Sequence, residues 1–200
     1  MEKVWQQHYP EGVPLEIDTH VYNSLQDVFL QSTQRFADLP AYVNLGKSIT
    51  YAEAEQLTGY FAAYLRHEVG LKKGDRIAVM MPNLLQYPIV LFAAFRAGLI
   101  VVNTNPLYTD RELKHQLQDS GAAAIVIVEN FAHTLQDVIA DTQVKTVITT
   151  RIGDMLGLKG HLVNFVVKHI KKMVPAFSLP TAISFKEALR KGRNHPFKDE

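Results

Sequence analysis

The feature that most constrains this chain is an alternation of short apolar runs with helical segments between residues 76 and 150. Continuous apolar strands joined by helices are typical of a parallel sheet that helices cover on both faces. The sequence therefore predicts an α/β fold with a mostly parallel, doubly wound sheet. The expected strands are 76–81, 99–102, 123–128 and 144–149, and the expected helices between them are 89–97, 109–121 and 131–139.

The first 70 residues contain local signals for helices and one hairpin. Ser24 and Thr50 each begin a sequence with the form of a capping box, in which a side chain satisfies the first free N–H groups of a helix. Residues 41–43 and 48–51 flank Gly46-Lys47 and predict a short hairpin. We expect Gly70 to end the second helix in the left-handed conformation that glycine adopts at little cost.

Composition excludes several classes of protein. The 200 residues include no cysteine, which removes disulfides and thiolate chemistry, and the net charge of +1 does not favour nucleic-acid binding. The first ten residues lack the apolar core of a signal peptide. Residues 84–102 are largely apolar, but Gln86, Pro88 and Arg96 interrupt them, so we expect a buried helix and strand rather than a membrane span.

Charge divides the chain into two parts. Residues 1–154 hold 12 basic and 17 acidic residues, whereas residues 155–200 hold 9 basic and 3 acidic residues. We therefore expect an N-terminal α/β subdomain over 1–154, and a basic amphipathic helix with a connecting segment over 155–200.

The sequence predicts no catalytic residue and no metal site within the chain. It contains no G-x-G-x-x-G, no G-x-x-x-x-G-K-[ST], no G-x-S-x-G and no H-E-x-x-H. We expect the glycines at 153, 157 and 160 to form a flexible surface turn, because no helix-opening pattern follows them.

A ligand-facing edge is nevertheless expected. In open α/β sheets, ligands bind beyond the carboxyl ends of the strands. Four asparagines follow the expected strands and are candidates for this edge, although asparagine is also favoured in turns and at helix N-caps for local reasons. They are Asn83, Asn103, Asn105 and Asn130.

Five segments follow one another in a specific order and spacing: Ser48–Glu53, Leu71–Asn83, Arg96–Gly98, Asn105–Thr109 and Asp119–Ala122. Together they resemble the adenylate-forming acyl-CoA synthetases, and the resemblance runs from about residue 20 to 150. Within that family the bacterial long-chain fatty-acid–CoA ligases look most similar, because they share the Asn-Pro-Leu-Tyr-Thr sequence and the long tail segment.

The resemblance implies a cytoplasmic enzyme that joins a fatty acid to coenzyme A, with ATP and Mg, through an acyl-adenylate. It also suggests homodimers built through the N-terminal domain. The family's phosphate-binding loop and its catalytic lysine have no counterpart here, so we expect the N-terminal part of a longer enzyme, inactive alone. The alternatives are a complete non-catalytic nucleotide-binding or interaction module, and a part of a luciferase-like or aryl-CoA ligase.

The tail contains a candidate membrane-binding helix over Leu162–Val174. On a helical projection its apolar residues share one arc, and Lys168, Lys171 and Lys172 lie opposite with His161 and Asn164. Pro175 is expected to end the helix. Such a helix can lie in an anionic lipid interface, peripherally at the inner face of the cytoplasmic membrane. The alternative is a surface helix whose apolar face packs on the sheet.

Overall fold

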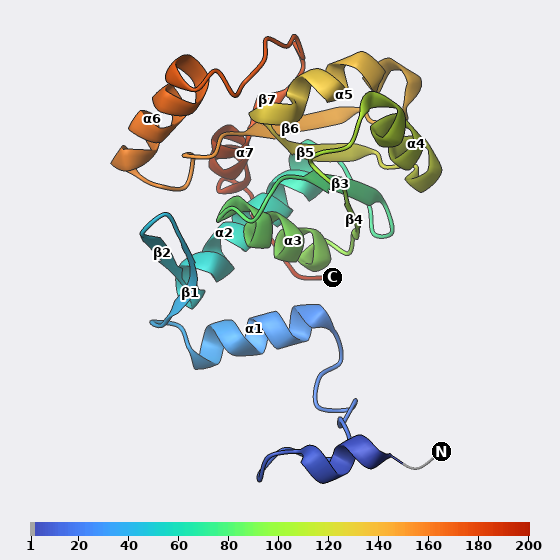
Figure 1. Ribbon diagram of the computed structural model, residues 1–200, viewed down its shortest axis with the longest axis vertical. Helices are drawn as coiled ribbons and strands as arrows, with labels where there is room; N and C mark the ends of the chain where they lie inside the picture. Colours follow the sequence, from blue (N-terminus) through green and yellow to red (C-terminus); the bar gives the residue numbers. More distant parts are fainter. Residues whose placement is uncertain (1–2) are drawn as a thin grey trace.

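A computed structural model, which describes residues 3–200, has a five-stranded parallel sheet at the centre of its body (Figure 1). The strand order is β4-β3-β5-β6-β7, and every neighbouring pair is parallel. This confirms the predicted fold class and adds β7, a two-residue strand that sequence patterns did not indicate. The strands are β3 (Arg76–Met80), β4 (Ile100–Asn103), β5 (Ala124–Val128), β6 (Thr146–Thr150) and β7 (Ile183–Ser184).

Helices cover both faces of the sheet, as expected. Side chains alternate along β3, so Ile77 and Val79 join a core cluster on one face while Ala78 and Met80 join another on the opposite face. The first face is covered by α2 (Tyr51–Ala63), α3 (Gln86–Arg96) and α7 (Phe185–Gly192), and the second by α4 (Asp110–Ser120) and α5 (Ala132–Val138).

Short single-turn elements link or extend these helices. A π-helical turn, η2, continues α2, while the 3₁₀ turns η3 and η4 stand before and after α5. Their bounds are η2 (Tyr64–Glu68), η3 (Glu129–Phe131) and η4 (Ile139–Asp141).

Local capping sets the helix starts largely as the sequence predicts. Thr50 and Thr109 form complete capping boxes at α2 and α4. At α1 (Leu25–Arg35) the Ser24 hydroxyl accepts from the Asp27 N–H, but the Asp27 carboxylate accepts from the Asn23 N–H instead of from Ser24. Those acceptor roles lower the pKa of Asp27. The box at Ser24 is therefore only half formed.

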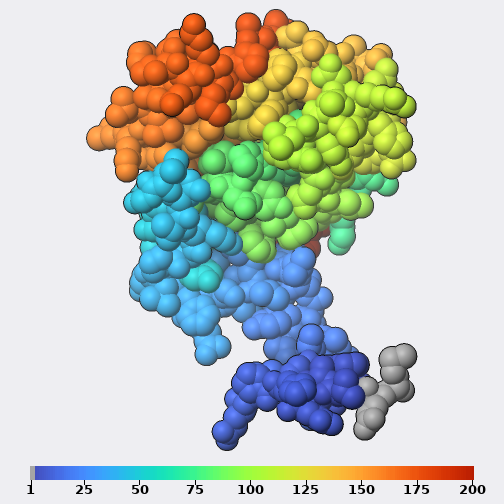
Figure 2. Space-filling model, viewed as in Figure 1, coloured from blue at the N-terminus to red at the C-terminus, as the bar shows by residue number. Residues whose placement is uncertain are grey.

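The region before the sheet comprises an extended N-terminal arm, α1 and a hairpin. The hairpin strands β1 (Pro40–Asn44) and β2 (Lys47–Thr50) pair antiparallel, as predicted. Residues 3–23 form the arm, whose one regular element is the 3₁₀ helix η1 (Val4–His8). The arm projects away from the body (Figures 1 and 2).

Residues 84–102 fold as α3 and β4, which confirms the predicted order of a helix followed by a strand. The inner face of α3 is buried, but the prediction of a buried strand is wrong, because β4 lies at the edge of the sheet and none of its residues is buried. The Arg96 side chain in this segment is only 6% exposed. Its guanidinium donates to the carboxylate of Asp199, to the carbonyl of Glu55 and to the hydroxyl of Thr58. Among residues 3–200, no helix is both long and apolar enough to span a bilayer.

The last part of the tail belongs to the same core as the sheet. Phe185 and Ala188 of α7 are fully buried, and the ring of Phe185 lies 5.1 Å from that of Phe61 on α2. Asp199 reaches the buried Arg96 of α3. The division at residue 154 remains a proposal about organisation, and in packing terms residues 183–200 complete the first face of the sheet.

The tail helix differs from its prediction in both ends and in its faces. It consists of α6 (Leu158–Phe165) and the π-helical turn η5 (Val166–Ile170), and it ends at Ile170 instead of at Pro175. Wide hydrogen bonds from Lys171 and Met173 to Val166 and Val167, with Lys172 at φ 50°, close it.

Asn164 does not lie on a solvent-facing arc with the lysines, because its side chain bonds the partly buried loop before α6. Val163 packs against the core, whereas Leu162 and Phe165 are more than half exposed. The apolar residues are therefore divided between an inner and an outer face, and neither of the two predicted arrangements is met in full.

The prediction of a flexible surface turn at the tail glycines is wrong for two of them. Gly153 and Gly160 are buried, and a Cβ on either would overlap the backbone carbonyl of the other. The loop and the first turn of α6 therefore approach each other at backbone distance, which only glycine permits.

Gly192 tests whether α7 docks on α2 as described. A Cβ there would overlap the carbonyl of Tyr60, whereas a Cβ on Gly59 would make ordinary contact with Arg96. We expect Gly192→Ala to lower the free energy of unfolding by about 1–3 kcal/mol, as overpacking does. Gly59→Ala is a matched control in a helix and should leave stability unchanged or raise it by up to about 1 kcal/mol. Urea denaturation measures both, and equal effects would contradict the docking.

Candidate functional site

The carboxyl edge of the sheet carries the predicted asparagines on neighbouring strands. Asn83 follows β3, Asn103 ends β4, Asn105 follows it, and Asn130 follows β5. The strand order reverses between β3 and β5, which is where ligands bind in open α/β sheets.

The four asparagine side chains do not converge on one point. The Asn103 Oδ1 accepts from the Tyr87 hydroxyl at 2.9 Å, and the Asn105 Oδ1 accepts from the Leu107 N–H in its own turn. Asn83 takes the Asn44 side chain on its backbone carbonyl. The buried Asn130 donates to the carbonyl of Met173 and so fixes the segment after η5.

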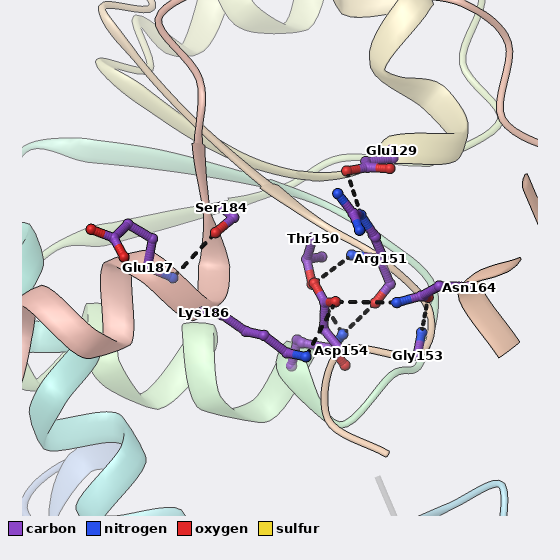
Figure 3. A network of polar contacts seen from close by, with 10 residues as sticks. Glu129, Thr150, Arg151, Gly153, Asp154, Asn164, Ser184, Lys186 and Glu187 are labelled. Atoms are coloured by element: carbon purple, nitrogen blue, oxygen red, sulfur yellow. Dashed lines mark hydrogen bonds and ion pairs between the residues drawn. The ribbon is translucent and has the colours of Figure 1, made fainter. Parts of the chain in front are cut away.

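A polar network around Asp154 holds α6 against the end of β6 (Figure 3). The Asp154 carboxylate, 9% exposed, accepts from the Thr150 hydroxyl, the Arg151 N–H and the Asn164 amide. The Lys186 ammonium of α7 lies 3.8 Å from it and balances its charge. Asn164 also accepts from the Gly153 N–H at 2.8 Å. These contacts fix the position of α6 relative to β6, because Asn164 of α6 bonds to Asp154, and Asp154 bonds to Thr150 of β6.

Gln86 joins the network from α3. Its side-chain amide donates to the Thr150 hydroxyl at 3.0 Å and to the carbonyl of Arg151 at 2.8 Å. Thr150 is 1% exposed, so its hydroxyl is closed to solvent, although it donates a hydrogen bond to the Asp154 carboxylate. The network is therefore a scaffold, and it does not form a nucleophile and base.

A cavity of about 200 Å³ lies between the ends of β5 and β6 and the α6–η5 helix. Among its lining residues, the Arg151 Nε donates to the Glu129 carboxylate at 2.9 Å. This hydrogen bond raises the pKa of Arg151. The remaining walls combine polar, basic and apolar side chains: Asn130, Ile152, His161, Asn164, Phe165, Val167, Lys168, His169 and Val174.

Of the sequence-predicted residues, the structure brings Asn130 and Lys168 to this cavity. Lys172 lines a second, shallower hollow with His133 and Met173 beside the β4 end, and Lys171 is exposed. All three lysines face solvent, as the sequence predicted. The cavity's Glu129, Arg151, His161 and His169 were not among the predicted site residues, although Glu129 and Arg151 directly follow β5 and β6.

The class of protein that this architecture defines is an open α/β domain, in which polar side chains follow the carboxyl ends of the parallel strands. A model of the "AMP-binding enzyme" family matches residues 29–177, which is most of the chain. The chain therefore belongs to the AMP-binding enzyme family.

Individual curated proteins match nearly the whole chain. The chain is 60% identical over 194 residues to a long-chain-fatty-acid–CoA ligase of Yersinia pestis, and 60% identical over 193 residues to one of Escherichia coli O157:H7. Each match covers 96% of this chain and 34% of the relative, so the chain spans about a third of the length of these relatives.

A solved structure supports the fold. The crystal structure of a long-chain-fatty-acid–CoA ligase from Archaeoglobus fulgidus superposes with a TM-score of 0.65. The superposition covers 88% of the present chain and 31% of the Archaeoglobus fulgidus chain, and the aligned residues are 20% identical. At this identity the likeness concerns the fold alone.

Proposed function

We propose that this chain is the N-terminal part of a cytoplasmic long-chain fatty-acid–CoA ligase. The observation that carries the proposal is 60% identity over nearly the whole chain to ligases of that name. In the full-length enzyme, a fatty acid and ATP would give an acyl-adenylate and pyrophosphate. The thiol of coenzyme A would then displace AMP and form the thioester. This level of identity favours the long-chain ligases over an interaction module or a luciferase-like or aryl-CoA branch.

ATP, Mg and coenzyme A are assigned by this proposal to the full-length enzyme. Among residues 3–200, no group of three His, Cys, Asp or Glu side chains is placed to hold a metal ion. The chain also contains neither of the glycine-rich phosphate-loop patterns, G-x-G-x-x-G and G-x-x-x-x-G-K-[ST]. Neutralising a triphosphate needs such donors and a cation. The role proposed for this chain is therefore structural: its α/β domain supports the remaining domains of the full-length enzyme.

Inactivity of the isolated chain follows from this assignment. We expect no pyrophosphate release above background when the 200-residue chain is given ATP, Mg and a long-chain fatty acid. The full-length reading frame that contains it is the positive control and should release pyrophosphate only when the fatty acid is present. Fatty-acid-dependent release by the chain alone, or none by the full-length protein, would contradict the proposal.

The α6–η5 helix is proposed to contact anionic membrane, peripherally and at the inner face of the cytoplasmic membrane. Four apolar side chains of this helix are more than half exposed: Leu158, Leu162, Phe165 and Ile170. Lys168, Lys171 and Lys172 are exposed beside them, and residues 155–186 contain no acidic residue. Apolar burial and attraction of lysines to anionic lipid would act together in this arrangement.

Replacing the three lysines with glutamine tests this contact without touching the core. We expect wild type to co-sediment with vesicles rich in phosphatidylglycerol, but not with phosphatidylcholine vesicles. Binding should weaken strongly in the triple variant, and in wild type at 1 M salt, where the Debye length is about 3 Å. Circular dichroism checks that the variant is folded. Equal binding of variant and wild type to anionic vesicles would refute the contact.

Self-association is proposed to use the N-terminal arm. The arm stands apart from the body (Figure 1) and exposes a series of apolar side chains. Packing of the arm against a second copy of the chain would bury them. They include Val4, Trp5, Val13, Leu15, Ile17 and Val21. Light scattering should show a mass that rises with concentration toward a dimer, and less so for Ile17→Ser. A monomer mass over a wide concentration range would argue against the dimer.

A further inference from the structure

The cavity beneath α6 has a net basic lining. The carboxylate of Glu129, 11% exposed, is its one acidic side chain, and Arg151 compensates it. That ion pair leaves Lys168 as an additional cation, with His161 and His169 on the same helix. The cavity can therefore accept a negative charge without leaving a carboxylate unpaired.

Two cationic side chains from different elements line this cavity and can donate to an anion: Arg151, which follows β6, and Lys168 of η5. The bond to Glu129 uses Nε of Arg151, and within residues 3–200 the two terminal nitrogens of this guanidinium have no hydrogen-bond partner. Planar guanidinium nitrogens suit phosphate oxygens, and an ammonium adds a point charge. Lys168 supplies that ammonium.

Size limits the ligand to a small group. Sites for drug-sized molecules measure about 300–1,000 Å³, whereas this cavity measures about 200 Å³. A whole nucleotide exceeds such a volume, but a single phosphate group does not.

The cavity is continuous with the outer apolar surface of the helix. Phe165 lines the cavity and is also 55% exposed, and its ring lies 5.1 Å from the imidazole of His169. Leu158 and Leu162 extend the same surface toward the start of α6, with 92% and 64% of their area exposed. A ligand with a phosphate and an attached apolar chain would match both parts.

We propose that this cavity binds the phosphate of an anionic phospholipid while Leu158, Leu162 and Phe165 lie among its acyl chains. The proposal rests on the membrane contact proposed above and adds a defined headgroup site to it. Arg151 and Lys168 contact the phosphate oxygens. Asp154, through Asn164, positions the wall that carries Lys168.

Comparing Lys168→Gln with Lys171→Gln distinguishes a specific headgroup site from general electrostatic attraction to an anionic membrane. Lys168 lines the cavity and Lys171 does not, yet both are exposed and three residues apart. With phosphatidylglycerol vesicles, Lys171→Gln should weaken partitioning by at most about fivefold, the effect of one lysine near an anionic surface. Lys168→Gln should weaken it by about tenfold or more, because a charged hydrogen bond is lost as well.

A second measurement uses inorganic phosphate as a soluble probe. At constant ionic strength, phosphate should shift the backbone amide NMR signals of Asn164 and Phe165 in wild type and not in Lys168→Gln. Equal losses of vesicle binding in the two lysine variants would overturn the headgroup site and leave the membrane contact standing. Failure of wild type to bind anionic vesicles would overturn both. Phosphate shifts without a greater loss in Lys168→Gln would identify an anion site that is not a lipid site.

Discussion

The need to cover both faces of a parallel sheet is the constraint on which the rest of this structure depends. All five residues of β5 are buried, and β5 lies between β3 and β6 in the middle of the sheet. Apolar burial contributes about 25 cal/mol per Å², so a strand buried on both faces favours any arrangement that supplies two helical layers. Four of the five helices that pack on the sheet lie between residues 51 and 138, and the fifth, α7, comes from the tail. The candidate ligand edge follows from the same topology, because parallel strands bring all their carboxyl ends to one side.

The elements whose signals are local could be predicted from the sequence. Thr50 and Thr109 cap helices through residues three positions away, and the apolar runs of β3 and β5 need no distant partner to be recognised. The tail could not be predicted in the same way. Gly192 of α7 lies so close to the Tyr60 carbonyl that no Cβ fits between them. The segment after α6–η5 is fixed where the Met173 carbonyl accepts from Asn130. In both pairs, Gly192 with Tyr60 and Asn130 with Met173, the partners are more than 40 residues apart in sequence, so no local sequence pattern predicts these contacts.

The same distinction applies to the candidate site. Sequence position alone pointed to the carboxyl edge of the sheet as a candidate ligand edge. It could not show that the Asn103 side chain accepts from Tyr87 or that the Asn105 side chain bonds within its own turn. Nor could it show that Glu129 and Arg151, which follow different strands, form a hydrogen bond of 2.9 Å and line the same cavity. What can be inferred from residue types is the chemistry available at an edge. Which groups share a cavity depends on the register of the strands and on the helix packed over them.

The tail is part of the same cooperative core as the sheet, so that α6 and its cavity are held by buried contacts. Native-state hydrogen exchange measures this directly, because amides in one cooperative unit share one opening free energy. We predict that amides of Ile183–Gly192 are protected to nearly the same degree as those of β6, while amides of the arm before α1 exchange fast. Exchange of Ile183–Gly192 as fast as the arm would show instead that the tail is not built into the core.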